Sequence, residues 1–231
     1  MPESSSTVVT PRVKVCCISS VEEAQLAIEL GASGLGLVSE MPSGPGVISE
    51  DQIRTIARRT PPGVSSFLLT CLQDPEAIIA QHRRCGTSTI QICDSLRHDA
   101  YEVVRAALPG ISLVQVIHVR DEGAIEQAGA VAPMVDAILL DSGNQSLPIK
   151  ELGGAGRVHD WTLSRRIVES VAAPVFLAGG LRPDNVRRAV DTVAPFGLDL
   201  CSGVRRDGRL DRELLAAFMS QLTGIRSSIT S

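Results

Sequence analysis

Two turns near the C-terminus, and a glycine-rich stretch before them, have the residue types that bind phosphate. Each of the two turns ends an apolar run in small residues and leads into a segment of helical character. Glycine lets the backbone approach a ligand closely, and successive N–H groups near the start of a helix attract anions. The candidate phosphate-binding residues are Gly154, Gly156, Gly179, Gly180, Ser202 and Gly203. They predict an enzyme that acts on a phosphorylated metabolite, although tight turns alone would also account for the glycines.

The elements that must position these turns alternate regularly along the chain. We expect eight strands, at residues 13–18, 33–38, 64–70, 88–92, 112–118, 136–140, 174–178 and 197–201. Helical periodicity follows each strand, at about 21–30, 50–58, 75–84, 96–107, 122–131, 163–171, 184–193 and 210–222. Eight strand-then-helix units in 231 residues favour an α/β protein with a single-domain (β/α)8 TIM barrel, and a doubly wound open sheet is the alternative.

A barrel would place the candidate phosphate turns side by side, because successive strand-to-helix turns meet at the carboxyl ends of the strands. Residues 13–231 are expected to form this barrel domain. Residues 1–12 are polar and include several Ser and Thr, so we expect a flexible N-terminal tail there.

The composition predicts a cytoplasmic enzyme rather than a nucleic-acid or membrane protein. The formal net charge is −4, which gives no basic surface for nucleic acid or anionic lipid. No segment is apolar for long enough to span a membrane, and the N-terminus has no apolar signal sequence. The six cysteines lack Cys-x-x-Cys pairs and zinc-finger spacing. We therefore predict no metal, no cofactor and a phosphorylated small molecule as the partner.

Four predicted strands end near a cysteine. Convergent thiols at one mouth would suit a soft metal, but strand-end packing explains each one separately, since free cysteine is commonly buried. His118 ends a predicted strand and His159 lies beside the glycine-rich stretch. For both we favour a core or solvated histidine over a proton shuttle or ligand contact. The four thiols are Cys16, Cys71, Cys93 and Cys201.

Six motifs, in order and in register from about residue 13 to 222, are similar to those of the phosphoribosylanthranilate isomerase family. They are Lys14-Val-Cys16-Cys17-Ile-Ser19, Gln91-Ile-Cys93-Asp94, Leu139-Leu140-Asp141-Ser142, Gly153-Gly154-Ala155-Gly156 with Asp160-Trp161, Leu177-Ala178-Gly179-Gly180-Leu181 with Pro183-Asp184-Asn185-Val186, and Asp199-Leu-Cys201-Ser202-Gly203-Val204. Any one motif alone would be a weak signal, but their order and spacing agree. The resemblance implies a (β/α)8 barrel, an isomerase of tryptophan biosynthesis, and a monomer or homodimer.

The resemblance also implies the reaction and its residues. The family carries out an Amadori rearrangement, in which an N-linked ribosyl 5-phosphate becomes a 1-deoxyribulose 5-phosphate. This needs an acid for the departing ring oxygen and a base for the C2′ proton. The family's strand-1 cysteine and strand-6 aspartate correspond to Cys16 as the base and Asp141 as the acid. Taken alone, Cys16 would be interpreted as a small buried residue and Asp141 as a turn residue. Further substrate-binding candidates are Lys14, Gln91, Cys93 and Arg205.

Several positions depart from the family pattern. Gly46 stands where the family has an arginine that binds the anthranilate carboxylate, and glycine cannot replace a bidentate donor. Cys17 takes a usual glycine position, and Arg205 a usual glutamate position. The lost arginine predicts weak or absent activity on phosphoribosylanthranilate, and it predicts that Gly46→Arg would raise this activity if the rest of the site is intact. Candidates for a substitute clamp are Arg157, Arg205 and Arg206.

Three functions therefore stay open. The first is phosphoribosylanthranilate isomerisation, the second is the same chemistry on a different aglycone in specialised metabolism, and the third is phosphometabolite binding without catalysis. Retention of Cys16 and Asp141 favours the first two over the third.

Overall fold

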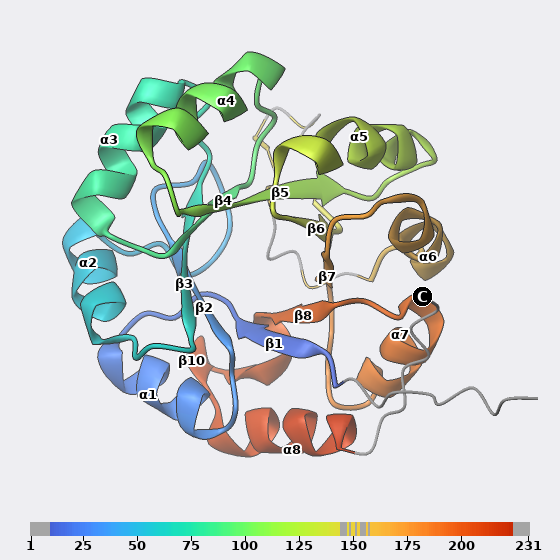
Figure 1. Ribbon diagram of the computed structural model, residues 1–231. Helices are drawn as coiled ribbons and strands as arrows, with labels where there is room; N and C mark the ends of the chain where they lie inside the picture. Colours follow the sequence, from blue (N-terminus) through green and yellow to red (C-terminus); the bar gives the residue numbers. More distant parts are fainter. Residues whose placement is uncertain are drawn as a thin grey trace, which may run out of the picture.

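Eight parallel strands close into one barrel in sequence order, with the helices outside it (Figure 1). The computed structural model describes residues 10–143, 147, 149–150, 152, 156 and 158–223. The barrel strands are β1 Arg12–Val15, β2 Gly34–Val38, β3 Ser65–Thr70, β4 Thr89–Ile92, β5 Ser112–His118, β6 Ala137–Asp141, β7 Val175–Leu177 and β8 Gly197–Leu200. The helices are α1 Val21–Glu29, α2 Glu50–Arg59, α3 Pro75–Cys85, α4 His98–Ala107, α5 Gly123–Val131, α6 Trp161–Ser170, α7 Val186–Val193 and α8 Arg212–Leu222.

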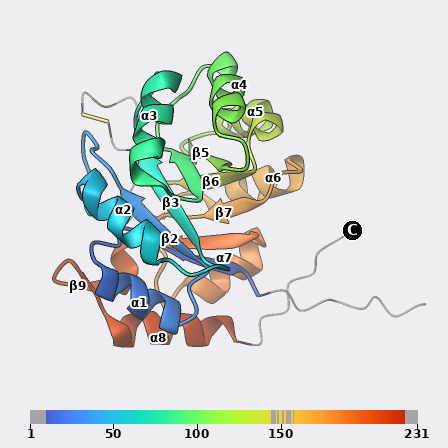
Figure 2. The same cartoon turned by 60° about the vertical axis from the view of Figure 1, so that its left-hand side comes forward.

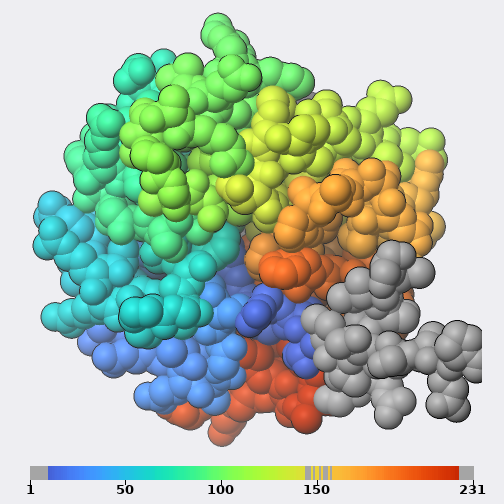
Figure 3. Space-filling model, viewed as in Figure 1, coloured from blue at the N-terminus to red at the C-terminus, as the bar shows by residue number. Residues whose placement is uncertain are grey.

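The expected (β/α)8 barrel is confirmed, and the open-sheet alternative is wrong, because β1 pairs with β8 as well as with β2. Seen as spheres from the same side, the segments follow one another around the face in sequence order (Figure 3). No helix of the described segments is long and apolar enough to cross a membrane.

Side chains at the helix starts explain where several helices begin. The Ser20, Ser49, Asp74 and Asp211 side chains each accept a hydrogen bond from a backbone N–H of the first turn. Such caps satisfy donors that the helix itself leaves free. Helix α3 also ends at Gly86, whose φ of 68° is the left-handed conformation that glycine adopts readily at a helix end.

Apolar residues fill two regions, one between the strands and the helices and one inside the barrel. Strand β2 serves both, because Leu35 and Leu37 join the outer core while its glycines face inward. A Cβ at Gly34 would lie 2.9 Å from the Phe67 ring, and one at Gly197 would lie 2.4 Å from the Phe176 ring. These glycines therefore make room for the two aromatic rings that pack inside the barrel.

Several element boundaries differ from expectation; for example, α7 and α8 each start two residues later than expected. Strand β1 starts at Arg12, inside the expected tail, and ends at Val15, so that residues 16–18 form a turn rather than strand. Helix α4 starts two residues later and α6 two residues earlier than expected. A short unexpected hairpin, β9 Arg205–Arg206 and β10 Arg209–Leu210, follows β8 and projects at the left of the barrel in Figure 2.

Candidate active site

A pocket of about 700 Å³, measured out to the open solvent, lies at the carboxyl ends of the strands. Cys16, from the turn after β1, and Asp141, the last residue of β6, both line it. The two proposed catalytic groups, 125 positions apart in the sequence, thus meet in one cavity, at the end of the barrel where active sites of this fold lie.

Cys16 sits directly after β1, and its N–H donates to the Leu200 carbonyl over 2.6 Å. The side chain is 6% exposed. A Cβ at Gly36 would lie 2.8 Å from the Cys16 Sγ and 3.1 Å from the Lys14 Nζ. The thiol and the ammonium group therefore face the same gap beside β2, which only a glycine leaves open.

Asp141 is held by the turn that follows it. Its Oδ1 accepts a hydrogen bond of 2.7 Å from the Ser142 N–H, and the residue is 7% exposed. The Asp141 carboxylate acts electrostatically on His159. Burial lowers the pKa of His159, while the negative charges of Asp141 and Asp160 oppose that shift. The His159 ring bonds to the Ser164 hydroxyl (2.7 Å). His159 is thus tied to α6 rather than positioned among the residues that line the pocket.

Most of the candidate phosphate residues come together in this pocket. Gly179 and Gly180 have φ values of 85° and 63°, a left-handed conformation in which glycine is unstrained. The Asn185 amide fixes this turn by donating to the Gly180 carbonyl (2.9 Å) and accepting from the Arg182 N–H (2.8 Å). The pocket-lining members of the set are Gly156, Gly179, Gly180, Ser202 and Gly203, and Gly154 lies outside the described residues.

The turns after β6, β7 and β8 also pack against one another. A Cβ at Gly203 would lie 2.0 Å from the Leu181 carbonyl oxygen, and one at Gly156 would lie 3.2 Å from the Ser202 Oγ. Glycine is therefore required at 203 by packing as well as suited to a ligand. The packing explanation is supported here, and phosphate binding by the same turns stays a prediction.

Lys14, predicted to bind substrate, does not line the pocket. Its Nζ forms a 2.8 Å ion pair with the Asp199 Oδ1 inside the barrel, and the side chains are 1% and 7% exposed. Burial would lower the pKa of Lys14, but Asp199 and the neighbouring Cys16 outweigh it and raise the pKa. Burial raises the pKa of Asp199, against the opposing effect of Lys14. The lysine is a buried cation below the pocket.

Gln91 and Cys93, also predicted to bind substrate, do line the pocket. Burial raises the pKa of the Cys93 thiol, which keeps it neutral. The Gln91 amide nitrogen donates to the Cys93 sulfur over 3.7 Å. The Gln91 Oε1 has no partner among the described residues.

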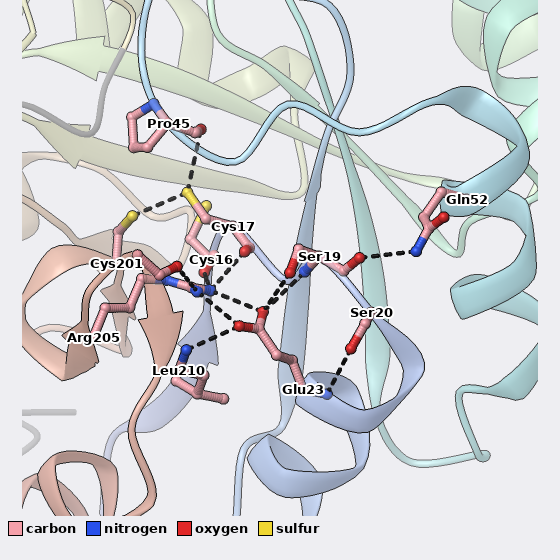
Figure 4. A network of polar contacts seen from close by, with 11 residues as sticks. Cys16, Cys17, Ser19, Ser20, Glu23, Pro45, Gln52, Cys201, Arg205 and Leu210 are labelled. Atoms are coloured by element: carbon pink, nitrogen blue, oxygen red, sulfur yellow. Dashed lines mark hydrogen bonds and ion pairs between the residues drawn. The ribbon is translucent and has the colours of Figure 1, made fainter.

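None of the candidate clamps lies in the described wall of the pocket. Arg205 pairs instead with Glu23 of α1 (Figure 4). Arg206 is 61% exposed and pairs with Asp211 at 3.3 Å. Arg157 lies outside the described residues. The idea that Arg205 binds substrate directly is therefore replaced by a role outside the pocket.

Cys17 was not anticipated as a neighbour of Cys201. Their sulfur atoms lie 2.9 Å apart, both line the pocket, and the Cys17 thiol also approaches the Pro45 carbonyl at 3.5 Å (Figure 4). The Cys16 and Cys201 thiols and burial raise the pKa of Cys17. The hydrogen bond between the two thiols lowers the pKa of Cys201, against the effect of burial.

Cys17 also overturns one expectation about Gly46. A Cβ at Gly46 would lie 2.5 Å from the Cys17 Cβ and 2.9 Å from its Cα, and Gly46 has a φ of 82°. Gly46→Arg would therefore force a clash and a strained backbone. The expected gain of activity is withdrawn.

The thiols at the strand ends do not all converge. The Cys71 Sγ contacts the Glu40 carbonyl at 3.3 Å, and Cys71 is not among the residues that line the pocket. Within the described ranges no group of three His, Cys, Asp or Glu side chains could hold a metal ion. His118 bonds to the Cys93 carbonyl (3.1 Å) and lines a separate cavity.

A contact across the pocket rim was missed by the sequence reasoning. The Lys150 Nζ forms a 2.5 Å ion pair with Asp94, and the Ser43 hydroxyl donates to the Lys150 carbonyl over 2.6 Å. Lys150 thus joins the loops that follow β2, β4 and β6. Lys150 and Lys14 are the only lysines of the chain, but neither its rarity nor its spacing marked Lys150 as a rim residue.

The fold and this site define a barrel enzyme in which a thiol and a carboxylate share a pocket with glycine turns suited to a phosphate. Comparison with known proteins supplies the family. The family model described as N-(5'phosphoribosyl)anthranilate (PRA) isomerase matches residues 13–221. The chain therefore belongs to the phosphoribosylanthranilate isomerase family, as the motifs suggested.

Similar proteins cover nearly the whole chain. The N-(5'-phosphoribosyl)anthranilate isomerase of Methanocella arvoryzae is 34% identical, over 91% of this chain and 97% of that protein. The Haloferax volcanii enzyme is 33% identical, over 94% and 96% respectively. The crystal structure of the Thermotoga maritima isomerase has a TM-score of 0.79 at 28% identity, covering 93% of this chain and all of that one. An isomerase complex with reduced 1-(o-carboxyphenylamino)-1-deoxyribulose 5-phosphate has a TM-score of 0.77 at 26% identity, with the same coverage.

Proposed function

We propose that this protein isomerises N-(5'-phosphoribosyl)anthranilate in tryptophan biosynthesis, with Cys16 as the general base and Asp141 as the general acid. The observation that carries the proposal is the meeting of these two side chains, one from the turn after β1 and one from the end of β6, in one pocket with the glycine turns. Family membership supplies the reaction, and the pocket supplies groups of the two kinds that the reaction needs.

The reaction begins with a proton from Asp141 to the ribose ring oxygen. The C1′–oxygen bond breaks as the nitrogen lone pair forms an iminium ion. The Cys16 thiolate then removes the proton from C2′, and the electrons of that C–H bond neutralise the iminium to give an enol-amine. Tautomerisation of the enol-amine yields the 1-deoxyribulose 5-phosphate.

Substrate binding in this proposal uses two ends of the pocket. The 5′-phosphate binds the backbone N–H groups of the turns after β7 and β8, with the Ser202 hydroxyl as a further donor. The aglycone lies at the apolar end, against Met41, Leu69 and Leu152. Gln91 contributes an amide oxygen that has no partner among the described residues.

The test is turnover of phosphoribosylanthranilate by the purified protein, with product measured by chromatography. Cys16→Ser and Asp141→Asn are expected to lower kcat by about 10²-fold or more, the scale of general acid–base contributions. Cys71→Ser is a matched control, because it removes a strand-end thiol that does not line the pocket. Near wild-type rates in Cys16→Ser or Asp141→Asn would remove that residue from its role, and no turnover by the wild type would refute the proposal.

A second candidate is the same rearrangement on a different aglycone. It is supported by the apolar lining of the aglycone end and by the Cys17 side chain, which occupies the space beside Gly46. Wild-type kcat/KM for phosphoribosylanthranilate and for phosphoribosyl derivatives of uncharged aromatic amines separates the candidates. A preference for the uncharged amines would favour the second. Binding without catalysis, the third alternative, predicts no turnover of any of them.

We also propose that the protein works in the cytoplasm as a monomer or homodimer. The structure describes all six cysteines and joins none of them in a disulfide, as expected in a reducing compartment. A Thermotoga maritima relative, 27% identical, is described as dimeric. Light scattering on the purified protein would decide between the two states.

A further inference from the structure

Arg205 lies outside the pocket, yet it holds the turn that carries Cys16. Its Nη2 donates to the carbonyl oxygens of Cys16 (3.0 Å) and Cys17 (2.5 Å), as Figure 4 shows. Its Nη1 donates to the Gly208 carbonyl over 3.0 Å, inside the β9–β10 hairpin. One guanidinium thus joins the β1–α1 turn to the hairpin after β8, two segments that lie far apart in the sequence.

Glu23 fixes the orientation of that guanidinium. Its two carboxylate oxygens lie 3.1 Å from Nη1 and 3.4 Å from Nη2 of Arg205, and the side chains are 8% and 13% exposed. The same carboxylate accepts hydrogen bonds from the Ser19 N–H (3.0 Å) and the Leu210 N–H (2.9 Å). Burial would raise the pKa of Glu23, but these hydrogen bonds and Arg205 lower it, so the carboxylate stays charged at neutral pH.

The turn needs such support because of Cys17. Cys17 has a φ of 60°, one of three non-glycine residues with positive φ among those described. A side chain with a Cβ is strained in this conformation, which persists only when the surroundings impose it. Cys17 follows Cys16 directly, so a change in its backbone would redirect the Cys16 side chain.

We propose that Arg205 is a positioning residue for Cys16: by binding the Cys16 and Cys17 carbonyls it imposes the left-handed turn that directs the Cys16 thiol into the pocket. Lysine could keep the charge next to Glu23 but could not reproduce the planar fork of donors. The proposal rests on the proposed function for its kinetic consequence, whereas its structural consequence concerns the Cys16 thiol alone.

The kinetic test is a double-mutant cycle between Arg205→Gln and Cys17→Gly. Arg205→Gln is expected to lower kcat about tenfold or more with KM little changed, because a small misplacement of a reacting group is costly. Glycine adopts a φ of 60° without strain, so Cys17→Gly should restore about threefold or more of the lost kcat in the double variant. An ion pair that only stabilised the fold would give independent effects at the two positions, and that result would overturn the proposal.

Arg212→Gln is the matched control. Arg212 of α8 pairs with Glu29 of α1 at 2.8 Å, and both side chains are about 60% exposed. This variant also removes an arginine–glutamate pair between the C-terminal part of the chain and α1, but it touches neither Cys16 nor its turn. Its kcat is expected to equal that of the wild type. If Arg205→Gln does not fold, Arg205→Lys takes its place, with the same cycle and the same outcomes.

A second measurement does not require turnover. The rate at which iodoacetamide alkylates Cys16, followed by mass spectrometry of the Cys16 peptide, is expected to change about threefold or more in Arg205→Gln. Arg212→Gln should leave it unchanged, and adding Cys17→Gly to Arg205→Gln should return it toward the wild-type rate. If the alkylation rates follow this pattern but the wild-type protein does not turn over phosphoribosylanthranilate, the proposed function is refuted and Arg205 is still a positioning residue. Equal alkylation rates in all four proteins would overturn the role of Arg205.

Discussion

Replacement of Lys14 by methionine separates a structural role from substrate binding. The Lys14 Nζ lies 2.8 Å from the Asp199 Oδ1 and 5.2 Å from the centre of the Phe67 ring, and the side chain is 1% exposed. Lys14→Met keeps most of the buried volume but leaves the Asp199 carboxylate without its cation. Breaking a buried pair on one side costs about 3–5 kcal/mol, because an uncompensated charge stays in the interior. We expect the free energy of unfolding to fall by that amount.

The magnitude can be checked within the same pair. Replacing both members by apolar residues of similar size is often neutral, because no charge is left buried. The variant Lys14→Met/Asp199→Leu is therefore expected to regain at least half of the lost stability. The assay is equilibrium unfolding in urea, followed by circular dichroism and by Trp161 fluorescence, with coincident curves as the condition for a two-state analysis.

The pH dependence of the wild type gives an independent check. The pKa of Lys14 is raised in the folded protein, so the stability due to its charge is fully present below its ordinary value of 10.5 and is lost as the pH rises through the folded value. The difference between wild type and Lys14→Met should therefore stay constant from neutral pH to about pH 10. A Lys14→Met protein with wild-type stability and a raised KM would refute this reasoning, and it would return Lys14 to the substrate site.

Three further outcomes follow from the site. Gly180→Val should weaken binding of a ribulose 5-phosphate analogue, measured by calorimetry, because valine is strained at a φ of 63° and its side chain blocks the approach of the phosphate; unchanged affinity would exclude the site. Gly46→Arg should lower the melting temperature without raising kcat/KM, because its Cβ would meet Cys17; a more active variant would contradict that packing. Glu23→Gln should lose stability at neutral pH. The difference in stability from wild type should shrink as the pH falls below 4.5, because the contacts that lower the pKa of Glu23 favour only its charged form, which is then protonated. A difference that stays constant with pH would be the contrary result.

The barrel could be predicted because its signals are local. Apolar runs alternate with helical periodicity, and residues such as Ser49 and Asp74 stand at the helix starts where caps are needed. The closure of the sheet followed from the number of units rather than from any residue at the closing edge. Gly197 lies on β8 at the closing edge and Gly34 on the second strand, β2. The need for glycine at these two positions is visible only in the structure, where the Phe67 and Phe176 rings pack against them.

The end of β1 could not be predicted from residue type. Residues 13–18 form an apolar run in which Cys17 and Ile18 look as suitable for a strand as Val15. The chain leaves the sheet because Cys17 takes a φ of 60°, which nothing in its own side chain favours. The cause lies in Arg205, 188 positions further along the chain.

Charged side chains near the mouth were the least predictable. Arg205 and Lys14 have the charge that a phosphorylated or carboxylated ligand requires, and both were predicted to bind substrate. Their partners Glu23 and Asp199 lie 182 and 185 positions away, so the sequence gives no sign that these charges are already compensated. Gln91 and Cys93 were placed correctly in the pocket wall because a strand end fixes the direction of its side chains without a distant partner.

Three departures from the family pattern are parts of one arrangement. The Cys17 side chain occupies the space that a side chain at position 46 would need, so glycine at 46 follows from cysteine at 17. A cysteine in the left-handed conformation also needs support from outside the turn. Arg205 provides it by donating hydrogen bonds to the carbonyls of Cys16 and Cys17. The missing arginine at 46 is then a consequence of packing in the β1–α1 turn. It is not by itself a sign that the substrate lacks a carboxylate, and the choice between the two aglycones depends on the kinetics of the wild-type protein.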